Sequence, residues 1–261
     1  MDEMKMKDFL NRLSSDSPTP GGGSASAASA AIGAALLSMV YSISRKKILK
    51  NLEKERKEIL NIIKREGESK VQRRERRNKI QESKNFCKDE KTQKVLIKKL
   101  KKSVDEAKKV MNELLLLIDE DTKAYENVLR KLRKLENLKT AESKVETDKS
   151  KVKINDTKDR KSSSEVEADI IRAKEDLQEA YKYAAEVPFQ IAKLCHGILK
   201  ISKNLSEKVY SPVKSDFKIA AALLEVGIKG AALNVEVNLK EIVDNDYVMK
   251  KRKESNKITK I

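Results

Sequence analysis

Aromatic, thiol and imidazole side chains are scarce in this sequence, and their scarcity excludes several kinds of site. Phe, Trp and Tyr together make up 4% of the residues, and Trp is absent. The two cysteines, Cys87 and Cys195, lie far apart without a C-x-x-C pattern, which excludes a disulfide framework and indicates a reducing, cytoplasmic compartment. A single histidine, His196, and the lack of paired thiols leave no metal-ligand cluster. We expect His196 to be structural or exposed.

Proline and glycine are also rare, with 4 and 8 residues among 261. The chain is rich instead in Ala, Leu, Glu and Lys, a bias that predicts an all-α fold, a helical bundle. Apolar periodicity and capping residues then predict the positions of the main helices. The predicted segments are 5–13, 24–45, 95–118, 165–208 with a kink or a new start at Pro188, and 216–239.

Charge is unevenly distributed along the chain, whose net charge is +17. Residues 45–109 contain 25 Lys and Arg against 11 Asp and Glu. Within them we interpret 67–91 as a basic insertion, either a charged helix projecting into solvent or a partly disordered segment. The stretch 131–164 is polar without a hydrophobic face, which predicts a linker or a disordered insertion. Residues 249–261 form a basic tail that we expect to fray, and 1–261 is otherwise expected to be one helical domain.

The least charged part of the chain is residues 17–38, SPTPGGGSASAASAAIGAALLS. Pro18 and Pro20 favour an extended segment and prevent helix before them, while Gly21–Gly23 allow a ligand to approach the main chain closely. Ser24 is a residue type preferred at a helix N-cap, and the free N–H groups of a helix start can bind an anion or a carbonyl. A structural turn without a ligand is the alternative interpretation. No Lys-Ser/Thr pair follows the last glycine, so the motif is not a nucleotide P-loop.

This uncharged segment must also be considered as a membrane helix. Residues 21–44 carry no charge and are long enough to span a bilayer. They consist mostly of Ala, Ser and Gly, which gain little free energy on entering lipid, and acidic residues near the N-terminus argue against a signal peptide. We expect a buried helix whose small side chains let another helix approach closely, in its own bundle or from a second subunit, and no membrane contact.

Four motifs follow one another along the chain. They are SPTPGGGS at 17–24 before the Ala-rich helix, LLLLIDEDTKAYENVL at 114–129, EAYKYAAEVPFQIAKL at 179–194, and SDFKIAAALLEVGIKGAALNVEVNL at 215–239. In this order they resemble the cyclodeaminase/cyclohydrolase family, which includes the helical domain of formiminotransferase-cyclodeaminase and stand-alone methenyltetrahydrofolate cyclohydrolases. The resemblance covers most of the chain outside the basic insertions.

The resemblance implies an all-α bundle that forms a homodimer, with a folate site between helices near the interface. A family cyclodeaminase expels ammonia from 5-formimino-tetrahydrofolate, whereas a cyclohydrolase adds water to 5,10-methenyl-tetrahydrofolate and gives 10-formyl-tetrahydrofolate. The resemblance implies that neither reaction needs a metal or a redox cofactor, and that the tetrahydrofolate derivative is the substrate. Both need proton transfer around a tetrahedral carbon, for which a positioned carboxylate is the expected group. Both activities stay open, and the lack of an attached formiminotransferase domain favours the cyclohydrolase.

Two positions are candidates for the catalytic carboxylate. Asp216 is the first, because it stands in the matching Ser-Asp motif at a predicted helix start. The alternative is that Asp216 only complements the helix dipole and that Ser215 only caps the helix. Asp121 is the second, with Asp119 beside it, because both end an apolar helical run, so that one could face a cleft while the other is solvated.

The remaining candidates would bind the substrate. Asn234 and Asn238 lie four residues apart on one helical face, where their amides would bond either a pterin edge or a partner helix. Lys46 and Lys47 follow the uncharged helix, where the family tends to have basic residues that could meet the glutamate tail of a folate. The predicted substrate-binding set is Gly21, Gly22, Gly23, Ser24, Ser215, Asn234, Asn238, Lys46 and Lys47.

The chain departs from the family just before its Ser-Asp motif, where Val209 and Tyr210 stand in place of a glycine and an asparagine. This departure leaves open a degenerate member that keeps the fold without the reaction. The net charge leaves open a basic nucleic-acid-binding helical protein. Nucleic acid is nevertheless the less expected partner, because the chain has no recognisable binding motif and few aromatics to stack bases. A structural helical adaptor is a third class.

Overall fold

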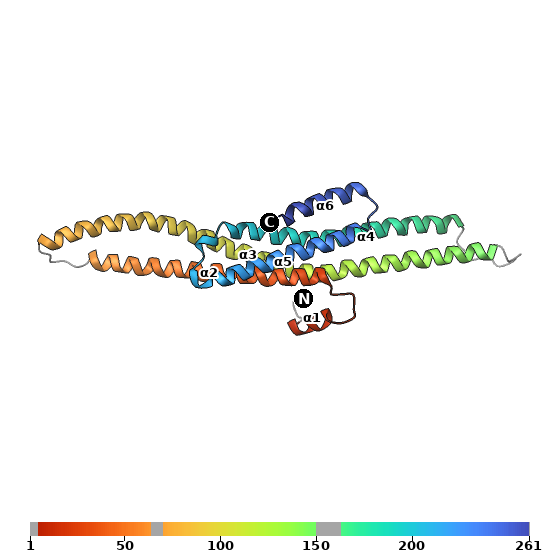
Figure 1. The fold of residues 1–261 in the computed structure, drawn as a ribbon, viewed down its shortest axis with the longest axis horizontal. Helices are drawn as coiled ribbons and strands as arrows, with labels where there is room; N and C mark the ends of the chain where they lie inside the picture. Colours follow the sequence, from red (N-terminus) through yellow and green to blue (C-terminus); the bar gives the residue numbers. More distant parts are fainter. Residues whose placement is uncertain (1–4, 64–69, 150–162, 261) are drawn as a thin grey trace. The chain divides into compact units, whose positions relative to one another are not determined.

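The computed structural model describes residues 5–63, 70–149 and 163–260, and every regular element among them is helical. The all-α class is therefore confirmed. Two short 3₁₀ helices, η1 and η2, join α4 to α5, and Figure 1 shows the helices in chain order. The elements are α1 (Met6–Leu13), α2 (Gly22–Ile63), α3 (Lys70–Lys149), α4 (Ser163–Lys203), η1 (Ser206–Lys208), η2 (Ser211–Val213), α5 (Lys214–Leu239) and α6 (Asn245–Thr259).

The chain divides into two compact units, and α2, α3, α4 and α5 each contribute residues to both. Unit 1 comprises Met1–Ala30, Glu113–His196 and Glu225–Ile261. Unit 2 comprises Ala31–Asn112 and Gly197–Leu224.

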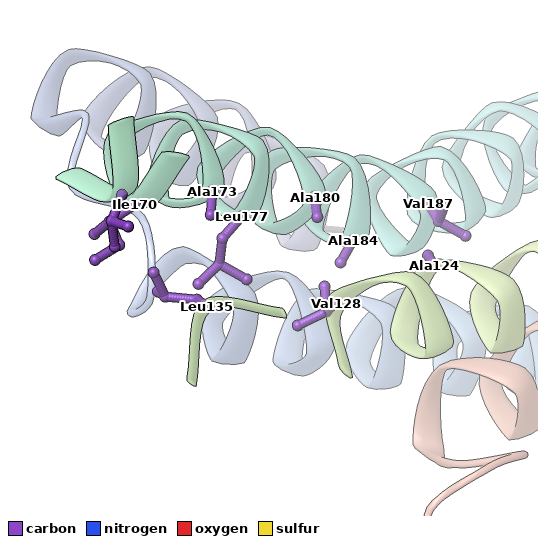
Figure 2. Close-up of a cluster of buried hydrophobic side chains, with 10 residues drawn as sticks. Ala124, Val128, Leu135, Ile170, Ala173, Leu177, Ala180, Ala184 and Val187 are labelled. Atoms are coloured by element: carbon purple, nitrogen blue, oxygen red, sulfur yellow. The ribbon is translucent and has the colours of Figure 1, made fainter. Parts of the chain in front are cut away.

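One core of unit 1 joins the second half of α3 to the first half of α4. Figure 2 shows small and branched side chains of the two helices pointing toward one another, among them Val128, Leu135, Ile170 and Leu177. Alanines alternate with these larger residues on α4, so the helix backbones can lie close together. Leu132 and Leu138 pack against the same cluster.

This core corrects the interpretation of 131–164 as a polar linker or a disordered insertion. Helix α3 continues to Lys149, and Leu132, Leu135 and Leu138 recur every three residues along it. That spacing is an apolar stripe on one helical face, although lysines surround it in the sequence. Residues 150–162 of the predicted insertion lie outside the described residues.

A second core of unit 1 attaches α6 to α4 and α5. Phe189, Val235, Leu239 and Val248 are buried together, with Tyr247 packed against them. The Lys251 ammonium lies 2.7 Å from Glu186 Oε2 and 4.1 Å from the ring centroid of Phe189. The expectation that 249–261 frays is therefore wrong for the described part of this segment, because α6 buries apolar and paired charged groups on the rest of unit 1.

Unit 2 is packed around the middle of α2, the first half of α3 and the segment from the end of α4 to the start of α5. Leu37, Tyr41, Leu100 and Leu224 are fully buried in it. The loop that departs from the family pattern is held here, because Val209 is buried and the Tyr210 N–H donates a hydrogen bond of 3.0 Å to the buried Ser44 hydroxyl.

Several predicted helix boundaries change. Helix α2 begins two residues before the predicted 24–45 and continues to Ile63. It is the one helix among the described residues that is long and apolar enough to cross a membrane, and 61% of its most apolar window is buried within the protein. The predicted basic insertion at 67–91 is helical from Lys70, as one of its two interpretations expected, and 67–69 lie outside the described residues.

Candidate active site

The start of α2 lies against α3 in unit 1. Ser24 is fully buried there, and its hydroxyl donates to Asp121 Oδ2 at 2.8 Å or to the Ile118 carbonyl at 3.2 Å. We call this cluster, formed by Gly22–Ser24, Ile118, Asp121 and Asn234, the Ser24–Asp121 site. The prediction that Ser24 caps α2 is wrong, because α2 begins at Gly22 and the hydroxyl bonds a different helix.

The hydrogen bonds of Ser24 depend on the protonation of Asp121. A serine hydroxyl carries one proton, so Ser24 can donate to only one of its two acceptors at a time. When Asp121 is ionised, its carboxylate competes with the Ile118 carbonyl for that proton. When Asp121 is protonated, it can donate to Ser24 Oγ while Ser24 donates to Ile118. The Ser24 hydroxyl therefore has a hydrogen-bond acceptor both when Asp121 is ionised and when it is protonated.

The glycines of the SPTPGGGS motif make room for side chains of the chain itself. A Cβ atom on Gly23 would overlap Asp121 Oδ1 and lie 2.6 Å from Asp121 Cγ. A Cβ atom on Gly22 would lie 3.3 Å from Asn234 Nδ2, whereas one on Gly21 would meet only the Pro18 carbonyl, at 3.3 Å. Glycine at position 23 thus allows the Asp121 carboxyl to reach the first turn of α2.

Asp121 is half-buried, and burial raises the pKa of its carboxyl above the ordinary value. The hydroxyl and the backbone N–H of Ser24 oppose this shift, because both stabilise the ionised form, but desolvation is the larger effect on the pKa. Such a carboxyl can accept and release a proton closer to neutral pH than a solvated aspartate can.

Asn234 and Asn238 lie on α5 in unit 1 with their amides turned toward neighbouring backbone. Asn234 Nδ2 donates to the Gly230 carbonyl at 2.8 Å, one turn earlier on the same helix. Asn238 Nδ2 donates to the Ala184 carbonyl of α4 at 2.9 Å. Pro188 stands four residues after Ala184 inside α4 and has no N–H to offer that carbonyl. Asn238 therefore satisfies an acceptor that the proline leaves free.

The pair of Glu120, which precedes Asp121 in the chain, and Tyr183 was not predicted from the sequence. The Glu120 carboxylate accepts hydrogen bonds from Tyr183 Oη at 2.8 Å and from Lys123 Nζ at 2.9 Å. Glu120 stands in the same acidic run as Asp121, which is a signal, but Tyr183 is brought to it only by the packing of α4 on α3. Asp119, the other predicted acid, lines a small cavity of about 200 Å³ with Phe9, Pro20 and Ile118 rather than joining Ser24.

The other predicted site residues belong to unit 2, apart from His196. Asp216 is half-buried and Ser215 exposed in the first turn of α5. The prediction that Ser215 caps this helix is wrong, because α5 begins at Lys214. Lys46 is exposed, and Lys47 Nζ lies 5.6 Å from the ring centroid of Tyr210. His196 is half-buried on α4 in unit 1.

Known proteins share both the sequence pattern and the fold. Methenyltetrahydrofolate cyclohydrolase of Methylorubrum extorquens is 27% identical over 248 residues, which are 94% of this chain and 84% of that protein. Formimidoyltransferase-cyclodeaminase of Gallus gallus is 34% identical over 71 residues, 27% of this chain and 13% of that protein. The crystal structure of formiminotetrahydrofolate cyclodeaminase from Thermotoga maritima aligns with 99% of this chain and 91% of its own, with a TM-score of 0.55 and 18% identity.

The family comparison covers three of the four motifs identified in the sequence, and the segment 114–129 with Asp121 lies outside the matched ranges. The model of the formiminotransferase-cyclodeaminase family matches residues 5–83 and 157–257. These ranges hold the glycine-rich start of α2, the Pro188 segment of α4 and the Asn234–Asn238 segment of α5. The predicted resemblance is confirmed, and the chain belongs to the formiminotransferase-cyclodeaminase family.

Proposed function

We propose that this chain acts in folate one-carbon metabolism, on the one-carbon unit at N5 and N10 of tetrahydrofolate. Of the two activities, we propose the methenyltetrahydrofolate cyclohydrolase. The observation that carries this choice is the similarity to a protein of that name over 94% of the chain. The half-buried carboxyl of Asp121 beside Ser24 would supply the proton-transferring group that the reaction needs.

The chemistry assigns a definite task to Asp121. Water adds to the methenyl carbon of the cationic substrate, and Asp121 takes the proton that the attacking water loses. The tetrahedral carbon then breaks its bond to N5, and the protonated Asp121 returns a proton to N5. The hydroxyl on that carbon loses its own proton to water and becomes the formyl oxygen of 10-formyl-tetrahydrofolate, so the reaction releases one proton overall. A carboxyl with a raised pKa suits both steps, because it accepts a proton as base and releases it as acid. Its ionised form also attracts the positive charge of the substrate.

Ser24 would assist by changing its hydrogen-bond partner. While Asp121 is ionised, the Ser24 hydroxyl donates to it, and once Asp121 is protonated the hydroxyl is free to donate to Ile118. The backbone at Gly22 and Gly23 would keep both groups in register. Ser24 is thus a positioning residue in this proposal. Asp216, Ser215, Lys46 and Lys47 keep their predicted roles as hypotheses that variants can test one at a time.

We also propose that the protein forms a homodimer through unit 1. On α5, Val226, Leu233 and Val237 are 53%, 69% and 61% exposed and follow one another at spacings of seven and four residues. That spacing forms one apolar face, and a second copy of the chain would cover it. Replacement of Leu233 by Glu should then halve the mass in solution measured by light scattering, and an unchanged mass would remove this face as the interface.

The first experiment measures the loss of 5,10-methenyl-tetrahydrofolate absorbance after addition of the purified protein. Wild-type protein should consume the substrate faster than buffer does, and Asp121→Asn should abolish most of that rate. Asp216→Asn, made in parallel, separates the two candidate carboxylates. Release of ammonia from 5-formimino-tetrahydrofolate, without consumption of the methenyl substrate, would instead establish a cyclodeaminase. A folded protein inactive on both substrates would be a degenerate member of the family.

A further inference from the structure

The net charge of the protein belongs entirely to unit 2. Unit 2 contains 30 Lys and Arg residues against 13 Asp and Glu, a net charge of +17, whereas unit 1 contains 28 of each and is neutral. A general preference of the host for lysine would raise the positive charge of both units. The excess is therefore a property of one compact unit, and a function that depends on it would lie there.

A row of lysines on α3 presents this charge to solvent. These lysine side chains are exposed, whereas Leu100, Ala107 and Val110 on the opposite side of the same helix are buried. Lys98, Lys101 and Lys102 have no carboxylate partner among the described residues, although Lys94 pairs with Glu90. From Lys91 to Lys109 the row extends about 27 Å at the helical rise of 1.5 Å per residue. The exposed members of the row are Lys91, Lys94, Lys98, Lys101, Lys102, Lys108 and Lys109.

The length of the row identifies the kind of anion that it fits. One strand of a nucleic acid carries a phosphate about every 3.4 Å along its axis, so the row would face about eight phosphates. A single small anion would meet only one or two of these lysines. A groove of about 690 Å³ opens beside Lys99 and Lys102, and is lined also by Ser103, Glu106 and Asn204. The Glu106 carboxylate in this lining would repel the phosphates of such a strand.

A membrane surface fits the same unit less well. A helix that lies in a lipid interface inserts an apolar face beside its basic one. The apolar face of α3 in unit 2, with Leu100, Ala107 and Val110, is already buried in the core, and Val95 is the large apolar side chain exposed beside the lysines. The lysine row can therefore attract an anionic surface, but the described part of α3 in unit 2 has no free apolar face to insert into lipid.

We propose that unit 2 binds the phosphate backbone of a nucleic acid through the lysine row of α3. Recognition is independent of base sequence, because the aromatic residues whose side chains are described in unit 2, Tyr41, Tyr210 and Phe217, are buried or half-buried and cannot form a stacking platform. This function is separate from the folate chemistry proposed for unit 1.

The test compares two triple variants that remove the same charge. Lys98→Gln with Lys101→Gln and Lys102→Gln neutralises the row, whereas Lys240→Gln with Lys250→Gln and Lys253→Gln neutralises three exposed lysines of unit 1. Circular dichroism verifies that both variants stay helical. Fluorescence anisotropy then measures the Kd of the full chain for a labelled 20-nucleotide RNA of mixed sequence and for a 20-base-pair DNA duplex between 50 and 200 mM KCl.

The wild-type protein should bind both probes with a Kd that rises steeply with salt. The α3 variant should bind RNA at least tenfold more weakly at 100 mM KCl, with a salt slope smaller by about 2, since each lost phosphate contact on a single strand removes about 0.7. The control variant should stay within twofold of wild type. Equal losses in the two variants, no binding by wild type at 50 mM KCl, or binding to phosphatidylserine vesicles without binding to RNA or DNA would overturn the proposal.

Discussion

Units 1 and 2 are similarly rich in charged side chains but differ in how those charges are balanced. In unit 1 many cations are paired with acids across helices, such as Lys131 with Asp176 at 2.7 Å and Arg252 with Glu236 at 3.0 Å. In unit 2 Arg56 bonds Glu90, but the lysine row of α3 has few acids to pair with. The balance of sign, rather than the amount of charge, separates the two units.

This difference has a consequence for the proposed chemistry. Nearby cations would lower the pKa of a carboxyl, because they stabilise its ionised form. The groups that shift the pKa of Asp121 are its burial and the two donors of Ser24, and no lysine or arginine is among them. The raised pKa of Asp121 therefore agrees with its position in unit 1, whose net charge is zero.

The largest expected effect comes from Asp121→Asn, which tests the assignment of the chemistry to unit 1. Turnover should fall by about 10²–10⁴-fold, the usual contribution of a general acid–base group. In wild type, the plot of log kcat/KM against pH should rise with the ionisation of Asp121, at a pH above that of an ordinary aspartate. A full rate in this variant, with loss in Asp216→Asn, would reverse the comparison and move the chemistry to unit 2.

The same variant should become more stable at neutral pH while it loses activity. The pKa of Asp121 is raised in the folded state, so folding favours its protonated form. Its contribution to stability is complete below the ordinary aspartate pKa and is lost as pH rises through the raised value. Asparagine is neutral at every pH and avoids that loss. Thermal denaturation should show a higher Tm for Asp121→Asn at pH 7.5 and a smaller difference at pH 4.

Gly23→Ala should disturb both the stability and the geometry of the Ser24–Asp121 site. The new methyl group would overlap Asp121 Oδ1, and the Ser24 hydroxyl bond restrains the carboxyl from moving away. We expect a destabilisation of about 1–3 kcal/mol, as for other overpacked sites, and a loss of turnover of about 10²-fold from misplacement of the carboxyl. Urea denaturation and the absorbance assay measure the two effects. Unchanged turnover would show that the carboxyl has no fixed position in the reaction.

The hydrogen bond from Asn238 to the Ala184 carbonyl gives a smaller, testable effect in the same unit. Asn238→Ala leaves that carbonyl without its donor and should destabilise the protein by about 1–3 kcal/mol. Pro188→Ala restores a backbone N–H for the same acceptor. In that background Asn238→Ala should cost less, with a coupling of about 1 kcal/mol in a double-mutant cycle. Additive losses would show that Asn238 and Pro188 act independently, and an increased KM in Asn238→Ala would favour the predicted contact with substrate.

Helical class and the main helices could be predicted because they depend on local composition and periodicity. The end of α3 was missed because lysines outnumber the leucines at 132, 135 and 138, and only α4 reveals what that stripe packs against. Helix α6 was missed because few of its residues are apolar, although Val248 and Lys251 attach it firmly.

The site was predicted as a set of residue types but not as an arrangement. Ser24 before a helical run looks like a cap, and its real partner, Asp121, is 97 residues further along the chain. The glycines were expected to admit a ligand, and the space at Gly23 is taken by that same carboxyl. Asn238 belongs with Pro188 through a backbone carbonyl, a relation that residue spacing cannot express. Tertiary contacts decide these roles, and local preferences do not.

The smallest expected effect sharpens the contrast between a glycine that a site requires and one that it does not. Gly197 lies on α4 in unit 2 and is exposed. Apart from its two chain neighbours and the nearby backbone of its own helix, no atom of the described residues lies within 4 Å of a Cβ added there. Alanine is the better helix former because it loses less backbone entropy on folding, so Gly197→Ala should stabilise the protein by about 0.5–1 kcal/mol. Turnover should not change. Urea denaturation of Gly23→Ala and Gly197→Ala side by side should therefore give shifts of opposite sign, and a destabilised Gly197→Ala would mean that space around a glycine does not distinguish the two positions.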